Sequence, residues 1–249
     1  MKKVGLMGYG TIGKFIGDSL HEDPAVDLQF VLRRKAAGAG PLNFVNDISG
    51  EILEGLNLVI EAAGTPVVHE YGLEILRHTD FMVFSITSLA HEEFFEKARE
   101  ACIKHNRRLF VPHGAVLGLD GIFDGRSLLT SVTITTMKTP KSFGLKKDEK
   151  AVLYEGSTRG ACAVYPKNVN VHAAVALAGL GFDKTRSAIV ADPEAPGNTH
   201  IIAVEGEGVK FEIKVESKSQ GGVTGKYTPY SGLGSIQRLL NRKPGIHIA

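Results

Sequence analysis

The sequence has no tryptophan, only two cysteines and no long apolar run. Cys102 and Cys162 lie far apart, so we expect two free, buried thiols rather than a disulfide framework or a zinc site. The nine histidines show no H-x3-H or H-E-x-x-H spacing, so we predict no metal. No stretch approaches the roughly 18 to 20 apolar residues that a membrane-spanning helix needs. We therefore expect a cytoplasmic protein that does not enter a membrane.

An excess of charge of one sign is also missing. The chain carries 29 Lys and Arg against 27 Asp and Glu, a formal net charge of +2, and the two signs are mixed along the sequence. Such a distribution provides no basic surface for nucleic acid or an anionic membrane. With 249 residues and 43% hydrophobic residues, the chain can instead bury a substantial core, in one large domain or two small ones.

Residues 1–112 alternate short β-like runs with amphipathic helical patterns. The apolar start breaks at Gly8, so it indicates a buried first strand rather than a secretory leader. We predict strands at 3–7, 28–32, 58–62, 81–85 and 108–112, and helices at 11–20, 67–78 and 92–105. Strands that alternate with helices in this way form a parallel sheet with right-handed crossovers. The fold class is therefore α/β, with an N-terminal doubly wound Rossmann domain.

Residues 113–230 have a different pattern, typical of an α+β domain built on a mostly antiparallel sheet that binds substrate. We predict strands at 131–136, 187–191, 200–204 and 209–215, a polar segment at 138–150, and a helix at 168–180. The glycines at 205–208 predict a hairpin. The last part, 231–249, is predicted to be a short helix and a tail that packs back on the first domain. Open sheet edges favour a homo-oligomer, a dimer or a tetramer.

A phosphate-binding turn is predicted at residues 8–13, G-x-G-x-x-G. The motif is weak alone, but here it follows the first strand and opens a helix. Gly8 permits the tight turn, Gly10 lets the backbone approach a pyrophosphate, and Gly13 lets the helix pack against the strand. Together with Thr11 and Ile12, this helix start would bind the dinucleotide, since its free N–H groups favour an anion.

The end of the second predicted strand bears on the choice between NAD and NADP. NAD-dependent enzymes carry Asp or Glu at this position, whereas this sequence reads Arg33-Arg34-Lys35. Guanidinium groups suit the 2′-phosphate of NADP. We therefore predict that NADP is preferred and NAD possible, although the same residues could form a solvated basic loop.

Two later strand ends should face the same crevice, because ligands bind at the carboxyl ends of parallel strands. Small residues there leave space for the ribose and the nicotinamide. The candidates are Ala63 and Gly64 after one strand and Ser85 and Thr87 after the next. Small residues are also common in tight loops that bind nothing.

Four segments together resemble the L-aspartate dehydrogenase family over essentially the full length. The first is the glycine turn at 4–14. The second, HGAVLGLDGI at 113–122, is similar to the family's S-G-A-x-x-G-L-D-x-[IL]. The third is YEGS at 154–157 followed by PKNVNV at 166–171, which matches P-K-N-x-N-V. The fourth is ADP at 191–193 with NTH at 198–200, which matches A-D-x…N-x-H. The third and fourth motifs are specific; the glycine turn is not.

The resemblance implies oxidation of an amino acid's Cα–N bond to an imine, with hydride transfer to nicotinamide. It places the catalytic histidine at His200, whose imidazole can accept a proton near neutral pH; without the motif, His200 would be read as a half-buried strand residue. It implies that Ala115 and one of Asn168 and Asn170 contact the cofactor. The two asparagines could equally be helix caps.

The substrate end is less closely matched. Lys138 and Lys167 are candidates for binding substrate carboxylates, although both could be exposed lysines. Where the family often has Arg-Lys, the sequence has Met137 before Lys138, and His113 replaces a serine. The family's N-P-K-T-S corresponds to GKYTP at 225–229, which makes Thr228 a further substrate-binding candidate. These departures cluster where substrate specificity is expected to be set.

Other functions remain open on the residues alone. One is a dehydrogenase or imine reductase that acts on a different amino or hydroxy acid, and another is a non-catalytic NADP-binding sensor. Dihydrodipicolinate reductase would require an H-H-x-x-K motif, which is absent. A phosphorylating aldehyde dehydrogenase would need an activated cysteine, and Cys162 has no activating context.

Overall fold

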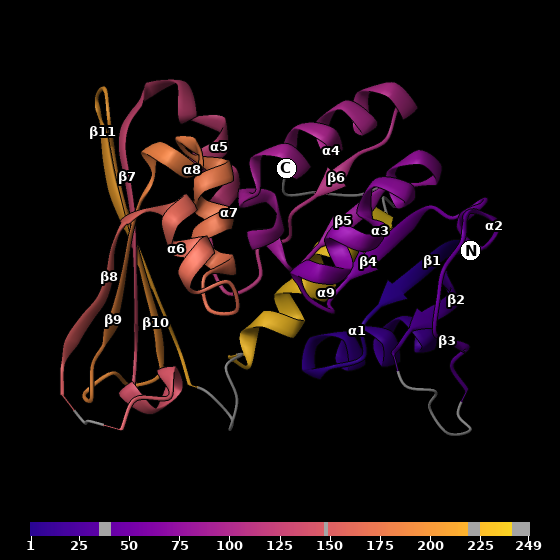
Figure 1. Ribbon diagram of the computed structural model, residues 1–249, viewed down its shortest axis with the longest axis horizontal. Helices are drawn as coiled ribbons and strands as arrows, with labels where there is room; N and C mark the ends of the chain where they lie inside the picture. Colours follow the sequence, from indigo (N-terminus) through magenta and orange to yellow (C-terminus); the bar gives the residue numbers. More distant parts are fainter. Residues whose placement is uncertain (35–40, 147–148, 219–224, 241–249) are drawn as a thin grey trace.

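The computed structural model describes residues 1–34, 41–146, 149–218 and 225–240. They form two sheets, and the helices of the second domain lie on the face of its sheet that looks toward the first domain (Figure 1). Lys35 of the basic stretch and the predicted tail at 241–249 lie outside the described residues. No helix in the described part of the chain is long and apolar enough to cross a membrane.

The N-terminal sheet is parallel, with the strand order β3-β2-β1-β4-β5-β6. Its strands are β1 (Lys2–Met7), β2 (Val26–Leu32), β3 (Phe44–Val45), β4 (Leu58–Glu61), β5 (Phe81–Val83) and β6 (Leu109–Phe110). This is the order of a doubly wound dinucleotide-binding fold, so the predicted fold class is confirmed. The order reverses between β1 and β4, and ligands bind at the carboxyl ends of the strands beside such a reversal.

The helices of this domain are α1 (Thr11–Glu22), α2 (Gly50–Leu53), α3 (Thr65–His78) and α4 (Glu92–His105), with a 3-10 helix η1 (Ile86–Ala90). The amphipathic pattern of α1 buries Ile16 and Leu20 against the sheet. β5 ends at Val83, so the prediction of an extended strand to residue 85 was wrong, because the chain turns at Ser85 into the buried 3-10 turn.

The second sheet has the order β11-β10-β7-β9-β8, and three of its four strand pairs are antiparallel. Its strands are β7 (Leu129–Lys138), β8 (Ala151–Ser157), β9 (Arg186–Ala191), β10 (Asn198–Gly206) and β11 (Val209–Ser217). The hairpin between β10 and β11 turns at Gly208, whose φ is +70°, as predicted. The sequence did not predict β8, which follows the polar segment.

The short helices of this domain are α5 (Leu119–Asp124), α6 (Thr158–Val164), α7 (Asn170–Ala178) and α8 (Gly181–Lys184), with the 3-10 turns η2 (Arg126–Leu128) and η3 (Pro140–Phe143). α7 begins two residues later than predicted, and neither asparagine caps it: its N-cap is Val169, with no side-chain capping bond. The capping interpretation of Asn168 and Asn170 was therefore wrong. Both asparagines have other surroundings, described below.

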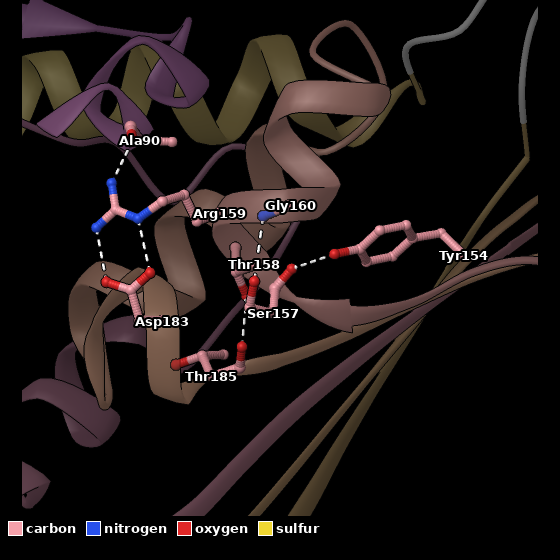
Figure 2. A network of polar contacts seen from close by, with 8 residues as sticks. All are labelled: Ala90, Tyr154, Ser157, Thr158, Arg159, Gly160, Asp183 and Thr185. Atoms are coloured by element: carbon pink, nitrogen blue, oxygen red, sulfur yellow. Dashed lines mark hydrogen bonds and ion pairs between the residues drawn. The ribbon is translucent and has the colours of Figure 1, made fainter.

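Several contacts hold the domains together. The last helix, α9 (Tyr227–Leu240), returns to the first domain, where Ile236 and Leu240 join the core around α1 and β1. On α6, the Arg159 guanidinium donates two hydrogen bonds of 2.7 Å to Asp183 and a third to the carbonyl of Ala90 in η1 (Figure 2). The larger apolar core cluster is also continuous from the first sheet into the second domain. Polar contacts, the last helix and a shared apolar core thus join the two domains.

Candidate active site

The glycine turn between β1 and α1 has the geometry that its motif predicts. Gly8 has a φ of +94°, and a Cβ there would lie 2.6 Å from the carbonyl oxygen of Ala62. A Cβ on Gly13 would lie 2.2 Å from the carbonyl oxygen of Gly8, so the helix packs directly on the turn. At Gly10, by contrast, a Cβ would meet nothing within 4 Å. The space in front of this helix start is open, as an approaching anion requires.

A groove runs across the carboxyl ends of the first sheet, and we call it the glycine-turn groove. Most of the predicted cofactor-binding residues line it, together with Tyr9, Phe84 and Lys167. The predicted residues in its wall are Gly8, Gly10, Ile12, Arg33, Arg34, Ala63, Gly64, Ser85 and Asn170. Thr11 and Gly13 are not part of its lining: Thr11 is exposed at the first position of α1, and Gly13 faces the turn.

Arg33 lies at one end of the groove beside two aromatic rings. Its guanidinium carbon is 5.9 Å from the centre of the Tyr9 ring and 5.8 Å from that of Phe44, and the two rings meet edge to face. Tyr9 is oriented in turn by a 2.6 Å hydrogen bond to Asp18. Arg33 and Arg34 are both exposed, so their charges are available to a ligand in the groove.

Glu61, the last residue of β4, organises the loops beneath the groove. Its side chain is 0% exposed. One carboxylate oxygen accepts hydrogen bonds from the backbone N–H groups of Ala63 (2.6 Å) and Gly64 (2.7 Å) and from the Ser85 hydroxyl (2.8 Å). The other accepts from the Ser85 backbone N–H at 3.0 Å. One buried carboxylate thus fixes both predicted strand-end loops.

A second hollow, the interdomain pocket, adjoins the groove. Four residues line both hollows, namely Ile12, Phe84, Lys167 and Asn170. The other predicted residues in the wall of the pocket are His113, Ala115, Lys138, Asn168, His200 and Thr228. Every predicted substrate-binding residue (His113, Lys138, Lys167 and Thr228) therefore lies in one pocket, although these residues come from four separate stretches of the chain.

His200 lies on β10 directly opposite Thr136 of β7. Its side chain faces the interdomain pocket, and the residue is 4% exposed. Nδ1 is 2.8 Å from the Thr136 hydroxyl, whereas no described residue is hydrogen-bonded to Nε2. Burial, and secondarily the charge of Lys138, lower the pKa of His200 to about 4. The imidazole is therefore neutral at pH 7 and can accept a proton.

Lys138 ends β7 on the same face of the sheet and is 3% exposed. Burial lowers its pKa to about 8. Among the described residues its ammonium group has neither a carboxylate nor a hydrogen-bond partner. A buried cation without a protein partner is costly, so an anionic ligand in the pocket would be bound strongly.

Of the remaining polar residues of the pocket, Asn170 forms hydrogen bonds within the protein, whereas Asn168 and His113 each have a buried atom without a partner among the described residues. The Asn170 Oδ1 atom accepts hydrogen bonds from the backbone N–H (3.1 Å) and the hydroxyl (3.3 Å) of Thr87. Thr87 is thus buried as a link between the domains and lines neither hollow, unlike the groove position predicted for it. Within the described chain, Asn168 Oδ1 and His113 Nδ1 are buried and have no partner. Burial also lowers the pKa of His113.

Sequence reasoning missed several residues around the site. Glu61 was assigned only to a strand, and Thr136, His172 and Ser187 were not singled out. Strand alternation could have found Thr136, because it shares one face of β7 with Val132, Ile134 and Lys138. A polar residue in an inward-facing register is unusual and indicates a functional or hydrogen-bonded position.

Comparison with protein families agrees with both halves of this site. Residues 123–239 match the profile "Aspartate dehydrogenase, C-terminal". Residues 8–112 match "Homoserine dehydrogenase, NAD binding domain". The first match spans β7 and β10, which carry Lys138 and His200, and the second begins at Gly8.

Individual relatives extend the match to nearly the whole chain. The L-aspartate dehydrogenase of Archaeoglobus fulgidus is 33% identical over 98% of both chains. That of Methanosarcina mazei is 30% identical over 97% of this chain and 98% of the relative. The crystal structure of aspartate dehydrogenase from Thermotoga maritima superposes with a TM-score of 0.83 at 28% identity, covering 99% of each chain. With this identity over nearly the full length, the chain belongs to the L-aspartate dehydrogenase family.

Proposed function

We propose that this protein is a nicotinamide-dependent dehydrogenase that oxidises L-aspartate. The observation that carries the proposal is the position of His200 and Lys138: a neutral imidazole and an unpartnered cation face one pocket, and that pocket adjoins the glycine-turn groove. The reaction would convert aspartate, with its amine as the ammonium, and oxidised cofactor into the protonated imine of iminoaspartate, reduced cofactor and one proton. The names of the relatives support this choice of substrate.

The residues present fit a nicotinamide dinucleotide. Gly8, Gly10 and Ile12 would hold its pyrophosphate at the open N-terminus of α1. Ala63, Gly64 and Ser85 would border its nicotinamide half. The unpartnered Oδ1 of Asn168 and the backbone at Ala115 would contact the same half from the second domain. When bound, the nicotinamide supplies a hydride acceptor. The protein's own side chains would bind and orient the substrate and accept its proton.

We further propose that NADP is bound in preference to NAD. The strand end where NAD-dependent enzymes carry an acidic residue has Arg33 and Arg34 here. The Arg33 guanidinium lies over Tyr9 and Phe44, which would restrict its orientation. A guanidinium can form paired hydrogen bonds with a phosphate.

His200 is proposed as the catalytic base. Its unpartnered Nε2 would accept the proton from the substrate ammonium. In the ligand-free protein, Lys138 helps to hold the imidazole pKa low. The two carboxylates of aspartate would offset that positive charge and raise the pKa of His200 toward its ordinary value, which makes it a stronger base once substrate is bound. Lys138 and the exposed Lys167 would bind these carboxylates, with His113 and Thr228 completing the wall.

The test is reduced-cofactor formation measured by absorbance with aspartate, glutamate, alanine and malate. We expect turnover with aspartate, and His200→Asn should lower kcat by about 10²- to 10⁴-fold, the usual contribution of a general base. His21→Asn, at the exposed end of α1, is the matched control and should keep full activity. Turnover confined to another acid, or an unimpaired His200→Asn variant, would refute the proposal.

We also propose that the protein is a cytoplasmic homo-oligomer. Both cysteines are free, which suits a reducing compartment. The second sheet ends in the open edge strands β8 and β11, and Val152 on β8 is 64% exposed. Such an edge favours pairing with another chain. Light scattering on the purified protein would give the mass, and a monomer at micromolar concentration would contradict the proposal.

A further inference from the structure

A chain of buried side chains extends from His200 away from the pocket. Thr136 lies at its first step, because its hydroxyl contacts both His200 Nδ1 (2.8 Å) and His172 Nε2 (2.6 Å). His172 comes from α7, which packs on the sheet, and its Nδ1 atom is 2.9 Å from the Ser187 hydroxyl on β9. Two histidines are thus joined through one threonine.

The chain ends at a backbone carbonyl. The Ser187 hydroxyl is 2.8 Å from the Thr158 hydroxyl, and Thr158 donates a hydrogen bond of 3.1 Å to the carbonyl oxygen of Thr185. Figure 2 shows this last step at the start of α6. The four members between His200 and the carbonyl are each at most 1% exposed. No member therefore has room to exchange its partner for bulk water.

The terminal carbonyl gives the chain a direction. A carbonyl only accepts, and a hydroxyl has one proton to donate. Because Thr158 donates to Thr185, Ser187 must donate to Thr158. Ser187 then accepts from His172 Nδ1–H.

The same logic continues to the pocket. A neutral imidazole carries one N–H, so with its proton on Nδ1, His172 accepts from the Thr136 hydroxyl at Nε2. Thr136 has then used its proton, and it accepts from His200 Nδ1–H. The lone pair of His200 is left on Nε2, the atom to which no described residue is hydrogen-bonded.

We propose that Thr136, His172, Ser187 and Thr158 are positioning residues that hold His200 in the Nδ1–H tautomer, with Nε2 ready to accept the substrate's proton. This proposal rests on the proposed function, because only a proton-accepting His200 benefits from it. The benefit is that protonation at Nε2 leaves every hydrogen bond of the chain unchanged. In the opposite tautomer, accepting a proton would require all of them to reverse.

The electrostatic surroundings support this arrangement. Among the described residues, the titratable groups that act on the two imidazoles are Lys138 and the imidazoles themselves. Burial, the His200 imidazole and Lys138 lower the pKa of His172 to about 3. His172 therefore stays neutral throughout the neutral range and retains one acceptor nitrogen. Because the chain ends at a carbonyl, it has no outlet for a proton, so it orients His200 and does not conduct protons to solvent.

The tautomer of His200 can be measured directly. Long-range ¹⁵N–¹H correlation spectra of the full-length, ¹⁵N-histidine-labelled protein at pH 7.5 distinguish protonated from bare ring nitrogens. The His200 signals are identified by their loss in His200→Asn. We expect a protonated Nδ1 and a bare Nε2. A protonated Nε2, or comparable amounts of both tautomers, would overturn the proposal.

Variants remote from the pocket test whether the chain sets this tautomer. Ser187→Ala removes a hydroxyl that does not touch His200. We expect mixed His200 tautomers and a kcat lowered about tenfold, in the range seen when the partner that orients a functional histidine is removed, with KM for aspartate within about twofold. A wild-type tautomer and unchanged kcat in this variant would overturn the proposal.

His172 offers a matched pair. His172→Leu removes both ring nitrogens, whereas His172→Gln supplies an amide that donates at one end and accepts at the other. We expect the leucine variant to lose the fixed tautomer and about tenfold in kcat, and the glutamine variant to recover most of both. The proposal would be overturned if the two variants had the same distribution of His200 tautomers and the same kcat.

The spectra also separate this proposal from the proposed function, because they need no turnover. A fixed Nδ1–H tautomer that is lost in Ser187→Ala supports the orienting chain even if aspartate proves not to be the substrate. Mixed tautomers in an enzyme that oxidises aspartate overturn the chain and leave the proposed function intact.

Discussion

The two halves of the site are built from different parts of the polypeptide. The glycine-turn groove is formed largely by backbone and small residues, held in place by one buried carboxylate, Glu61. The functional groups of the interdomain pocket are large polar side chains such as Lys138 and His200, which come from strands far apart in the sequence. The first half is specified by local conformation. The second exists only after the sheet has brought its strands into register.

The difference determines how each half should respond to substitution. In the groove, a single added methyl group changes the space available to a ligand or to the turn itself. In the pocket, shape matters less than charge and hydrogen bonding, because the functional atoms lie at the ends of long side chains. Substitutions in each half test this division.

The largest effect is expected at the glycine turn. Gly13→Ala would place a methyl group 2.2 Å from the Gly8 carbonyl oxygen, so helix or turn must move, and we expect cofactor affinity to fall by about 100-fold or more, with a lower Tm. Gly10→Ala has open space and a φ of −82°, which alanine adopts readily. It should keep the wild-type Tm and lose affinity alone. Calorimetric titration with NADP, together with thermal unfolding, measures both quantities.

The opposite results for these two glycine variants would contradict the proposed difference between the groove and the pocket. A stable Gly13→Ala variant with normal cofactor affinity would show that the turn can shift to accommodate a methyl group beside the Gly8 carbonyl. A Gly10→Ala variant with normal affinity would place the pyrophosphate away from the helix N-terminus.

The next effect is expected at Lys138, and it depends on pH. The Lys138 amine is protonated and positively charged below its lowered pKa of about 8, and it loses this charge as pH rises above that value. Inhibition by succinate, a dicarboxylate without an amine, should therefore weaken as pH rises through 8. Lys138→Met should bind succinate about 30-fold or more weakly, the effect of removing one partner of a buried charge pair, and without this pH dependence. Constant inhibition to pH 9.5 in the wild type would exclude Lys138 as the cation.

The same contrast explains what the sequence could and could not reveal. The glycine turn was predictable because Gly8, Gly10 and Gly13 are close in the sequence and each has a steric reason. His200 and Lys138 were found through family resemblance, and the only local signal for either is its inward-facing register on its strand. His172 was missed because a single histidine in an apolar helix gives no functional signal by itself. Its role follows only from its hydrogen-bond contacts with Thr136 on β7 and Ser187 on β9.

A smaller effect is expected from Glu61→Gln. The glutamine oxygen can keep the contacts of one carboxylate oxygen, but its NH2 group would face the Ser85 backbone N–H, leaving a buried donor without an acceptor. Such a group costs about 1–3 kcal/mol, which corresponds to a fall in Tm of roughly 2–12 °C for a chain of this size. Cofactor affinity should fall in parallel, because both loops shift. Thermal unfolding with and without NADP measures both effects. Glu54→Gln, on an exposed residue at the end of α2, is the control and should leave Tm unchanged.

The smallest effect is expected at the exposed end of the groove. Removing the guanidinium in Arg34→Ser should weaken NADP binding about tenfold, because a charge-assisted hydrogen bond to phosphate contributes about 1.5–3 kcal/mol when well formed and less when solvated. NAD binding should stay the same, since NAD has no 2′-phosphate. Arg33→Ser should weaken binding of both cofactors, because Arg33 also lies over Tyr9 and Phe44. Dissociation constants at low and high salt give the comparison. Equal losses for NADP and NAD in Arg34→Ser would mean that this end of the groove recognises the adenosine by contact rather than by charge.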